Sequence, residues 1–429
     1  QAVQGFLTMK RVLRLAEHRH RPSGKTASFI EHHDFRSVYQ PILSPTHQKM
    51  VGYEALVRVR RGNQPVAPPS LFEQASIQGV TSELDRHLLN LHLENFTQAN
   101  LPIWLFININ PDTLFHHNDY LSVLADHCHQ LGVHPEKIVL ELVETASRDS
   151  ATLLEFVQEA KARGFQIAID DFGMGDSNFE RLWRINPLIV KIDRSLLMNA
   201  QDHTRARLLL NSLVRMIRES GSLVLIEGIE NNAQAHIALA TEADLLQGFL
   251  FARPGQGSEE LTQTAETALR QVMSESERWC QNDFRTRETY LKLLRFEIMD
   301  ACHALARGEE FDRVCRPLLQ MEGVRRCFLL DQKGVQQGSL AQSGASRNAA
   351  FNPLYQSAGA CWSHREYFRN ALERPQHISC SRPYVALPDA RRTVTLSTGT
   401  SLAQGHRIFC VDIHPDEVLD GQVLFPDTL

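Results

Sequence analysis

The sequence lacks the features of a membrane or secreted protein. No uninterrupted apolar run approaches the roughly 20 residues that a membrane-spanning helix needs. The apolar segment 6–15 is interrupted by Lys10, Arg11 and Arg14, so it does not form the core of a secretory signal either. No two cysteines form a CxxC motif or have zinc-ligand spacing with histidine, so we interpret the eight cysteines as buried, reduced thiols. We therefore expect a cytoplasmic protein without a transmembrane segment.

The sequence also has no excess of basic residues. Its formal net charge is -5, so bulk electrostatics does not predict a nucleic-acid polymer as partner. The hydrophobic fraction of 43% and the charged fraction of 22% are typical of globular domains. With 429 residues, the chain is long enough for one large barrel and an appended module.

One pattern recurs from about residue 35 to 255: a short apolar run ends in a polar residue and is followed by a helical stretch. Near-continuous apolar runs that alternate with helices indicate buried parallel strands. Seven runs have this form: Met50–Tyr53, Trp104–Ile107, Lys137–Leu140, Phe165–Ile169, Leu188–Val190, Leu223–Ile226 and Asp244–Leu246. The pattern predicts an α/β fold with a TIM-type (β/α)8 barrel over residues 30–256.

The rest of the chain differs from this pattern. We interpret residues 1–29 as an N-terminal tail or a tag remnant. Residues 257–308 predict a helical linker that ends at Gly308 and is able to pair with a second copy of itself. Short strands over 309–429 predict a smaller α+β domain. The apolar stripe of the linker consists of Leu291, Leu294, Ile298, Cys302 and Leu305.

The strand ends of the predicted barrel carry oxygen donors and no histidine. Oxygen-only ligands favour Mg²⁺ or Mn²⁺ over Zn²⁺, and carboxylates gathered at one mouth repel each other unless cations lie between them. Two metal ions sharing a carboxylate are an arrangement that cleaves phosphodiesters. A single acidic residue after a strand is as often a helix N-cap, but a whole set in register is not explained in that way. The set is Glu54, Asn108, Glu141, Asp170, Asp171 and Glu227, with Lys191 as one cation among them.

Several segments resemble the EAL domain, a family that hydrolyses cyclic di-GMP to linear pGpG. The resemblance covers about residues 30 to 255 in the correct order, which makes it far more specific than a lone EAL tripeptide. The matching segments are Tyr39–Ile42, Gly52–Arg58, Ile107–Pro111, Glu141–Glu144, Ile169–Gly173, Val190–Asp193, Glu227–Glu230 and Gln247–Phe251.

The resemblance implies two divalent ions, Mg²⁺ or Mn²⁺, in each active site. Glu54, Asn108, Glu141 and Asp170 resemble the ligands of the first ion, and Asp170 with Asp171 those of the second. Lys191 resembles the residue that orients the nucleophilic water, and Glu227 the carboxylate that supports metals and water. Gln247 belongs to the implied catalytic set together with Glu54, Lys191 and Glu227.

The same resemblance implies the substrate contacts: Gln40, Leu56, Arg58, Asp193 and Gln247. It also implies a homodimer. Glu144 resembles the anchor of the loop that links metal binding to dimerisation in the family. The family usually reads DDFGTGYSS in this loop, whereas here Met174 and Asp176 replace the threonine and the tyrosine.

In the C-terminal segment, the stretches Trp362–Phe368, Ser381–Tyr384 and Thr393–Ser397 resemble PAS-like or Cache sensor domains, which present Trp, Arg, Tyr and Asp side chains around a small-molecule pocket. An arginine with aromatic residues is suited to a carboxylate ligand, and an aspartate to an amine. An equally good interpretation is that the aromatic residues belong to the core. The candidate ligand contacts are Trp362, Arg365, Tyr367, Tyr384 and Asp412.

Two functions compete at this point. The first is a metal-dependent phosphodiesterase regulated by the C-terminal domain. The second is a cyclic di-GMP receptor with weak or no turnover, and the substitutions at Met174 and Asp176 keep this alternative open. Since none of the implied metal ligands is missing, the sequence favours the enzyme.

Overall fold

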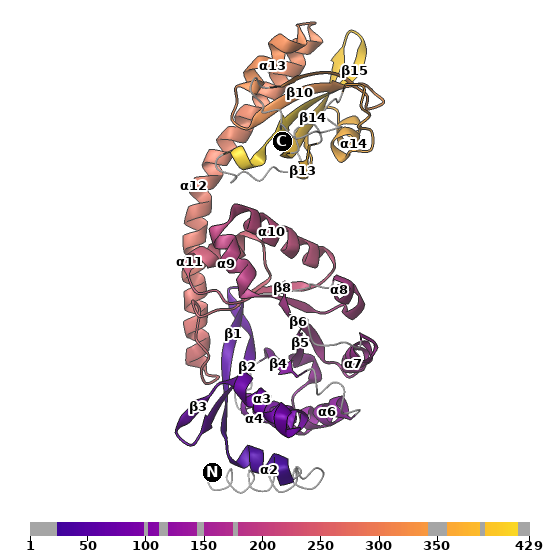
Figure 1. Cartoon of the computed structure of the whole chain (residues 1–429). Coiled ribbons are helices and arrows are strands. Elements are labelled where there is room, and N and C mark those ends of the chain that lie inside the picture. The colour runs from indigo at the N-terminus through magenta and orange to yellow at the C-terminus, as the bar shows by residue number, and fades with distance from the viewer. Residues whose placement is uncertain are drawn as a thin grey trace. The chain divides into compact units, whose positions relative to one another are not determined.

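The chain divides into two compact units, residues 1–276 and 277–429 (Figure 1). The computed structural model describes residues 24–97, 102–110, 119–143, 150–174, 179–341, 358–386 and 391–418. The division falls inside helix α12 (Glu259–Ala306), which occupies almost the whole range of the predicted linker.

The first unit is built on a closed barrel of eight strands. Neighbouring strands follow the order β1-β9-β8-β7-β6-β5-β4-β2, and β1 also pairs with β2, which closes the ring. The barrel strands are β1 (Asp34–Ser44), β2 (Lys49–Arg61), β4 (Trp104–Ile109), β5 (Ile138–Val143), β6 (Gln166–Phe172), β7 (Ile189–Ile192), β8 (Leu223–Ile226) and β9 (Leu245–Leu246). The barrel and the seven strand runs predicted from the sequence are therefore confirmed.

One strand differs from an all-parallel TIM barrel. Strand β1 runs antiparallel to both β2 and β9, whereas the remaining neighbours are parallel. Only residues 45–48 separate β1 from β2. A parallel connection needs a dozen residues or more, so this short link permits only a hairpin. Strand β3 (Gln64–Val66) extends the same hairpin beyond the barrel.

Helices surround the barrel, and apolar side chains fill its interior. Ile42, Phe106, Val139, Ile189 and Leu225 from different strands form the inner cluster. Helix α2 lies partly within the range 1–29 that was predicted as a tail. The helices are α2 (Gly24–Glu31), α3 (Pro68–Gln78), α4 (Thr81–Thr97), α6 (Tyr120–Leu131), α7 (Ser150–Ala162), α8 (Phe179–Ile185), α9 (Arg194–Asp202), α10 (Thr204–Glu219) and α11 (Asn232–Ala240).

A buried histidine joins α4 to β1. The imidazole Nδ1 of His92 lies 2.7 Å from Ser37 Oγ, and the Tyr39 hydroxyl donates to the His92 carbonyl oxygen over 2.9 Å. Burial, with a smaller effect of His87, lowers the pKa of His92 to about 4 from its ordinary value of 6.5. The ring is therefore neutral in the native protein at pH values where the unfolded chain already binds a proton.

This histidine predicts a pH-dependent stability. Between pH 7 and 4 the free energy of unfolding is expected to fall by about 3 kcal/mol through His92 alone, since only the unfolded state takes up the proton. Urea titrations at several pH values measure the slope. His92→Asn keeps a polar partner for Ser37 and should flatten the curve. Equal slopes for the two proteins would contradict the assignment.

The second unit contains an antiparallel sheet, as predicted for an α+β domain. Its main strand order is β11-β10-β15-β14-β12, and β13 pairs with β14. The predicted stripe of α12 is confirmed, because Leu294, Ile298, Cys302 and Leu305 are buried in the core of this unit. The remaining elements are α13 (Phe311–Leu319), β10 (Val324–Leu330), β11 (Gln336–Ala341), α14 (Glu366–Glu373), β12 (Ser379–Cys380), β13 (Tyr384–Val385), β14 (Arg392–Leu402) and β15 (Gly405–Ile413).

The cysteines fit the prediction of buried thiols with one exception. The seven cysteines whose side chains the structure describes are free, and six of them are buried. Cys361 is exposed because it lies in the turn region before α14, where its thiol contacts the Lys333 carbonyl oxygen and Ser363.

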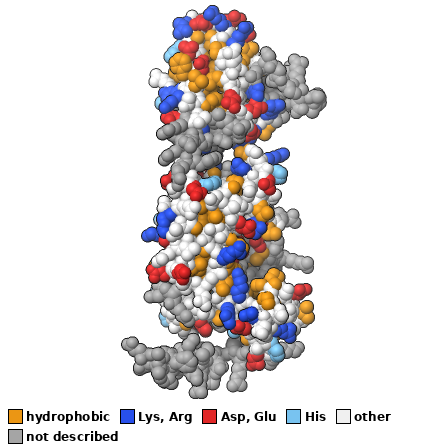
Figure 2. Space-filling model, turned by 90° about the vertical axis from the view of Figure 1, so that its left-hand side faces the viewer, with side chains coloured by type: hydrophobic (Ala, Val, Ile, Leu, Met, Phe, Trp, Pro, Cys, Tyr) orange, Lys and Arg blue, Asp and Glu red, His pale blue; other side chains and the backbone are white. Residues whose placement is uncertain are grey.

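The described surface and helices add two observations. Over the face drawn in Figure 2, acidic, basic and apolar side chains are interspersed, as expected for a chain with a small net charge. Within the described ranges, no helix combines the length and apolar character needed to cross a membrane.

Candidate active site

The predicted metal ligands converge at one mouth of the barrel. Asn108 and Glu141 lie near the carboxyl ends of β4 and β5, and Glu227 directly follows β8. Glu54 lies within β2, which continues beyond the barrel to Arg61, and the neighbouring pair Asp170 and Asp171 belongs to β6. The strand run predicted from the sequence ends at Ile169, directly before this pair, but β6 continues to Phe172. Instead, the register between β6 and β7 shifts between Ile169 and Phe172, and Asp171 has a φ of 56°. This bulge places both carboxylates at the mouth, although neighbouring strand residues normally point to opposite faces.

The Lys191 ammonium group lies in the middle of four carboxylates. Its Nζ is 2.6 Å from Glu141 Oε1 and 2.7 Å from Glu227 Oε1. The distances to Asp170 Oδ1 and Glu54 Oε1 are 3.0 and 3.8 Å. Both Lys191 and Glu141 are fully buried. Removal of these charges from water is costly, so the cluster depends on its internal compensation.

The cluster shifts the pKa values of its members. Burial raises the pKa of Glu141 and of Glu227 well above the ordinary glutamate range, against the opposing effect of Lys191. Burial also raises the pKa of Asp171, with Asp170 and Asp193 adding to the effect. Burial by itself lowers the pKa of Lys191, but the surrounding carboxylates outweigh it and raise that pKa well above its usual value. Lys191 therefore stays protonated at neutral pH.

Glu54 is oriented by two amides. Its Oε1 accepts a hydrogen bond from Asn108 Nδ2 over 3.2 Å, and its Oε2 accepts one from Gln247 Nε2 over 2.6 Å. Asn108 lies in β4, which pairs with β2 on one side, and Gln247 follows β9, which lies beyond β1 on the other side, so the two amides approach Glu54 from opposite directions along the barrel wall. Such partners fix the direction of a carboxylate that is to bind a metal.

Gly248 allows Gln247 to reach this position. A Cβ atom at Gly248 would lie 2.0 Å from the carbonyl oxygen and 2.4 Å from the nitrogen of Ile229. Gly248→Ala is therefore expected to push β9 away from Ile229, to destabilise the protein by about 1–3 kcal/mol or more, and to displace Gln247 from Glu54. Thermal unfolding and turnover are the measurements. Gly255→Ala is the matched control, because a Cβ there meets only ordinary contacts at 3.8 Å, and equal effects of the two changes would refute the packing argument.

The donor set fits divalent cations in its chemistry. Among the described residues, the buried oxygens Glu141 Oε2 and Gln247 Oε1 accept no hydrogen bond, so they are available to a cation, whereas Glu141 Oε1 and Glu227 Oε1 contact the Lys191 ammonium. In the described part, no three His, Cys, Asp or Glu side chains already form a metal cage. Within the cluster, the Lys191 ammonium lies between the Glu141 and Glu227 carboxylates and contacts both. Oxygen-only donors are the type that Mg²⁺ and Mn²⁺ prefer.

Two cavities adjoin the carboxylates. One of about 250 Å³ is lined by Gln40, Glu54, Asp193, Glu227 and Gln247. A neighbouring one of about 320 Å³ is lined by Leu56 and Arg58 together with Asn108. All residues predicted as substrate contacts therefore line these two cavities.

The loop after β6 is described only in part. Met174, which replaces a threonine of the family pattern, is 59% exposed. Asp176 and the predicted loop anchor Glu144 lie outside the described residues.

The sequence reasoning missed an ion pair at the rim of the first cavity. Arg194 Nη1 lies 2.6 Å from Glu230 Oε1, and both residues line that cavity. The signal was present, since Glu230 ends the Glu227–Glu230 motif and Arg194 directly follows Asp193.

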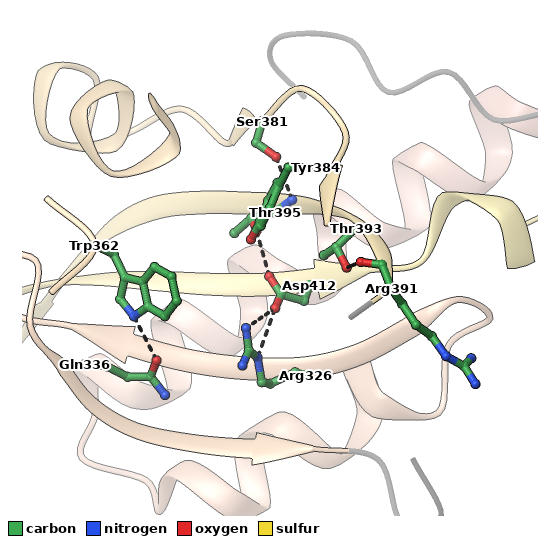
Figure 3. A network of polar contacts seen from close by, with 9 residues as sticks. All are labelled: Arg326, Gln336, Trp362, Ser381, Tyr384, Arg391, Thr393, Thr395 and Asp412. Carbon is green, nitrogen blue, oxygen red and sulfur yellow. Dashed lines mark hydrogen bonds and ion pairs between the residues drawn. The ribbon is translucent and has the colours of Figure 1, made fainter. Parts of the chain in front are cut away.

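Three of the five candidate ligand residues of the second unit, Trp362, Tyr384 and Asp412, contact polar side chains of neighbouring elements (Figure 3). Asp412 accepts from Arg326 Nε over 2.9 Å and from Thr395 Oγ1 over 2.7 Å. Trp362 Nε1 donates to Gln336 Oε1 over 3.0 Å. The carboxylate predicted to take an amine is therefore already paired with a guanidinium group that the sequence analysis did not identify.

The aromatic residues of this region stack. The rings of Tyr367 and Tyr384 are 6.2 Å apart and nearly parallel, and the Arg365 guanidinium lies 5.1 Å from the centre of the Tyr384 ring. The Tyr384 hydroxyl and Thr395 Oγ1 are 2.6 Å apart. Arg365, Tyr367 and Tyr384 thus form one stacked group, and the Tyr384 hydroxyl links this group through Thr395 to Asp412.

Comparison with known proteins bears on both units. The family model of the EAL domain matches residues 25–254. A model of the DSHCT (NUC185) domain matches residues 210–328, a stretch that begins in α10, ends in β10 and crosses the division between the two units. The second match therefore corresponds to neither unit as a whole.

Two relatives align with more than half of this chain and more than half of their own length. The uncharacterised EAL-domain protein YkuI of Bacillus subtilis (strain 168) is 24% identical over 80% of this chain and 86% of its own length. The cyclic di-GMP phosphodiesterase RocR of Pseudomonas aeruginosa is 26% identical over 52% of this chain and 58% of its own. Other relatives are longer: this chain spans 29% of the signalling protein YkoW of Bacillus subtilis.

One solved structure resembles most of the chain. The crystal structure of Bacillus subtilis YkuI, solved with substrate c-di-GMP and calcium, has a TM-score of 0.72 and covers 89% of this chain and 96% of its own. The two sequences are 22% identical, so this likeness shows a common fold.

Proposed function

The chain belongs to the EAL-domain family, and we propose that it hydrolyses cyclic di-GMP to linear pGpG. The observation that carries the proposal is the convergence of Glu54, Glu141, Asp170 and Glu227 around Lys191 at the barrel mouth. An isolated carboxylate has many uses, but four on one buried ammonium form a site that divalent cations can enter. RocR, a relative, is a cyclic di-GMP phosphodiesterase, and YkuI was crystallised with c-di-GMP and calcium.

We propose two ions, Mg²⁺ or Mn²⁺, in each site. Glu54, Asn108, Glu141 and Asp170 would hold the first, and Asp170 with Asp171 the second. Bound there, the ions would polarise the phosphoryl oxygens and lower the pKa of a bound water. Glu227 would support both the ions and the water. The β6 bulge supports this assignment, because it turns Asp170 and Asp171 to the same side.

The other side chains of the site would orient the water, orient Glu54 and bind the substrate. The protonated Lys191 would orient the water and favour its deprotonated form by its positive charge. Gln247 would hold Glu54 in its ligand orientation through their 2.6 Å hydrogen bond. Gln40, Leu56, Arg58 and Asp193 would bind the dinucleotide in the two adjoining cavities.

Chromatography of cyclic di-GMP incubated with the purified protein tests the proposal. We expect pGpG with Mg²⁺ or Mn²⁺ and none with a chelator. The second candidate, a receptor with weak or no turnover, is favoured by the exposed Met174 in the loop after β6. Binding of cyclic di-GMP without hydrolysis in either metal would select the receptor.

We also propose a homodimer. Phe179 and Trp183 on α8 and Leu209 on α10 are 54%, 69% and 65% exposed, which is unusual for such large apolar side chains. Burial of these side chains in an interface would remove them from water. Sedimentation equilibrium should give twice the mass of the chain, and a monomer at micromolar concentration would contradict the proposal.

For the second unit we propose a PAS-like sensory or dimerisation domain that regulates the barrel and binds a small ligand. An antiparallel sheet with β10 and β15 paired at its centre supports this assignment. Trp362, Arg365, Tyr367, Tyr384 and Asp412 remain the candidate contacts, although a ligand amine would have to compete with Arg326 for Asp412. A thermal-shift screen of small carboxylates and amines tests the ligand proposal, and no shift with any of them would count against it.

We propose the cytoplasm as the compartment. The free thiols described above support a reducing environment. Fractionation of cells that express the protein tests this proposal, and recovery from another compartment would contradict it.

A further inference from the structure

A row of side chains leads outward from the carboxylates along the β1–β2 hairpin. Alternate residues of a strand share a face, and residues directly opposite each other on paired strands share it too. Starting at Glu54, this rule defines one face that continues beyond the barrel. The pairs on it are Gln40 with Glu54, Val38 with Leu56, and Arg36 with Arg58.

The burial of the hairpin is consistent with this assignment of faces. Val57 and Val59, which alternate with Arg58, are buried in a cluster with Leu71 and Leu84 of α3 and α4. Arg36 and Arg58 are both exposed, as expected for the face that continues from the mouth. Arg36 is therefore on the same side of the hairpin as the predicted substrate contact Arg58, and directly opposite it.

Two opposed arginines on neighbouring strands repel each other and destabilise a hairpin. The only acidic residue within the two paired segments 34–38 and 56–61 is Asp34, whose carboxylate lies 3.3 Å from Arg36. That pair is weak, because its side chains are 69% and 54% exposed. Arg60 and Arg61 add further positive charge to the same segments. The hairpin thus presents a surplus of positive charge beside the cavity that Arg58 lines.

We propose that Arg36 is a substrate-binding residue that shares one phosphodiester group of the cyclic dinucleotide with Arg58. This inference rests on the proposed function. The substrate has two phosphodiester groups, and while one lies at the carboxylate cluster, the other is held between the two guanidinium groups. An anion placed there replaces their repulsion by two charge-assisted interactions, which arginine makes with phosphate in a bidentate geometry.

Calorimetric titration with cyclic di-GMP, in chelator so that no turnover occurs, tests the inference. Arg36→Gln is expected to weaken binding roughly tenfold, the effect of losing a charge-assisted hydrogen bond. In turnover assays the same change should raise KM by a similar factor and leave kcat within about twofold, because the contact is remote from the reacting atoms. Arg36→Lys keeps the charge and should lose only part of the affinity.

Arg61→Gln is the matched control. Arg61 is an exposed arginine of the same hairpin, but by alternation it lies on the face opposite to Arg58. Its replacement removes one positive charge and should change binding by less than about twofold. In the double variant Arg36→Gln/Arg58→Gln, the losses should be smaller than the product of the single losses, because the two residues share one anion.

The outcomes separate this inference from the function on which it rests. If the unmodified protein binds cyclic di-GMP and Arg36→Gln binds as tightly as Arg61→Gln, the inference is wrong and the proposed function stands. If the unmodified protein neither binds nor hydrolyses the dinucleotide, the proposed function itself fails. Circular dichroism of Arg36→Gln shows whether its fold is intact, and an intact fold with tenfold weaker binding supports the inference.

Discussion

Replacement of Glu54 by alanine is expected to lower hydrolysis of cyclic di-GMP by about a thousandfold or more. The change removes a proposed metal ligand, and it also releases Asn108 and Gln247, which both donate to this carboxylate. A metal contribution of several kcal/mol to the transition state accounts for a loss of this size. Initial rates of pGpG formation at saturating Mn²⁺ measure it.

The binding and control experiments make this prediction specific. Dinucleotide binding by Glu54→Ala should survive in part, because Gln40 and Arg58 are untouched. Glu159→Ala removes an exposed glutamate of α7 that pairs with Arg163, and it should leave turnover within about twofold. Full activity of Glu54→Ala would show that the proposed first metal site is wrong.

Replacement of Lys191 by methionine is expected to destabilise the metal-free barrel by about 3–5 kcal/mol at pH 7. The change leaves Glu141, which is fully buried, and its neighbours Glu227 and Asp170 without their central cation. Because burial already raises the pKa of Glu141 and Glu227, the variant should bind protons more tightly when folded than when unfolded. Its stability deficit should therefore shrink as the pH falls from 7 to 5. Urea unfolding in chelator measures both effects.

Metal ions provide a second test of the same cluster. Mn²⁺ should restore part of the lost stability of Lys191→Met, since a ligand that binds only the folded state stabilises it. Lys292→Met is the control: the Lys292 side chain is 73% exposed and its ammonium pairs with Glu288, so its loss should cost no more than about 0.5 kcal/mol. If Lys191→Met were as stable in chelator as the unmodified protein, the claim that Lys191 compensates the charge of the buried carboxylates would be wrong.

The barrel and the convergence of acidic side chains at its mouth were predictable because each depends on a local pattern. Apolar runs followed by a polar residue mark the strands, and parallel strands bring their carboxyl ends together. The antiparallel direction of β1 was not predicted. The segment Tyr39–Ile42 was identified only by its resemblance to the EAL domain and was not among the predicted strands. The link at 45–48 indicates the antiparallel direction, because it is too short for a connection between parallel strands.

Other features depend on contacts that no local pattern records. The bulge at Asp170 and Asp171 is a register shift against β7, and a sequence of alternating residues does not reveal it. Likewise, Asp412 was expected to be available to a ligand, but it pairs with Arg326, 86 residues earlier in the chain. The pairing follows from the register between β10 and β15, which only the folded sheet defines.

The central claim is that the carboxylate cluster supports attack of water on a phosphodiester bond of cyclic di-GMP. The most direct test is to incubate the protein with cyclic di-GMP and Mn²⁺ in ¹⁸O-labelled water and to analyse the product by mass spectrometry. We expect linear pGpG with one ¹⁸O atom in its terminal phosphate, and no product in chelator. Intact cyclic di-GMP after incubation with protein that binds it would contradict the claim and leave the protein as a receptor.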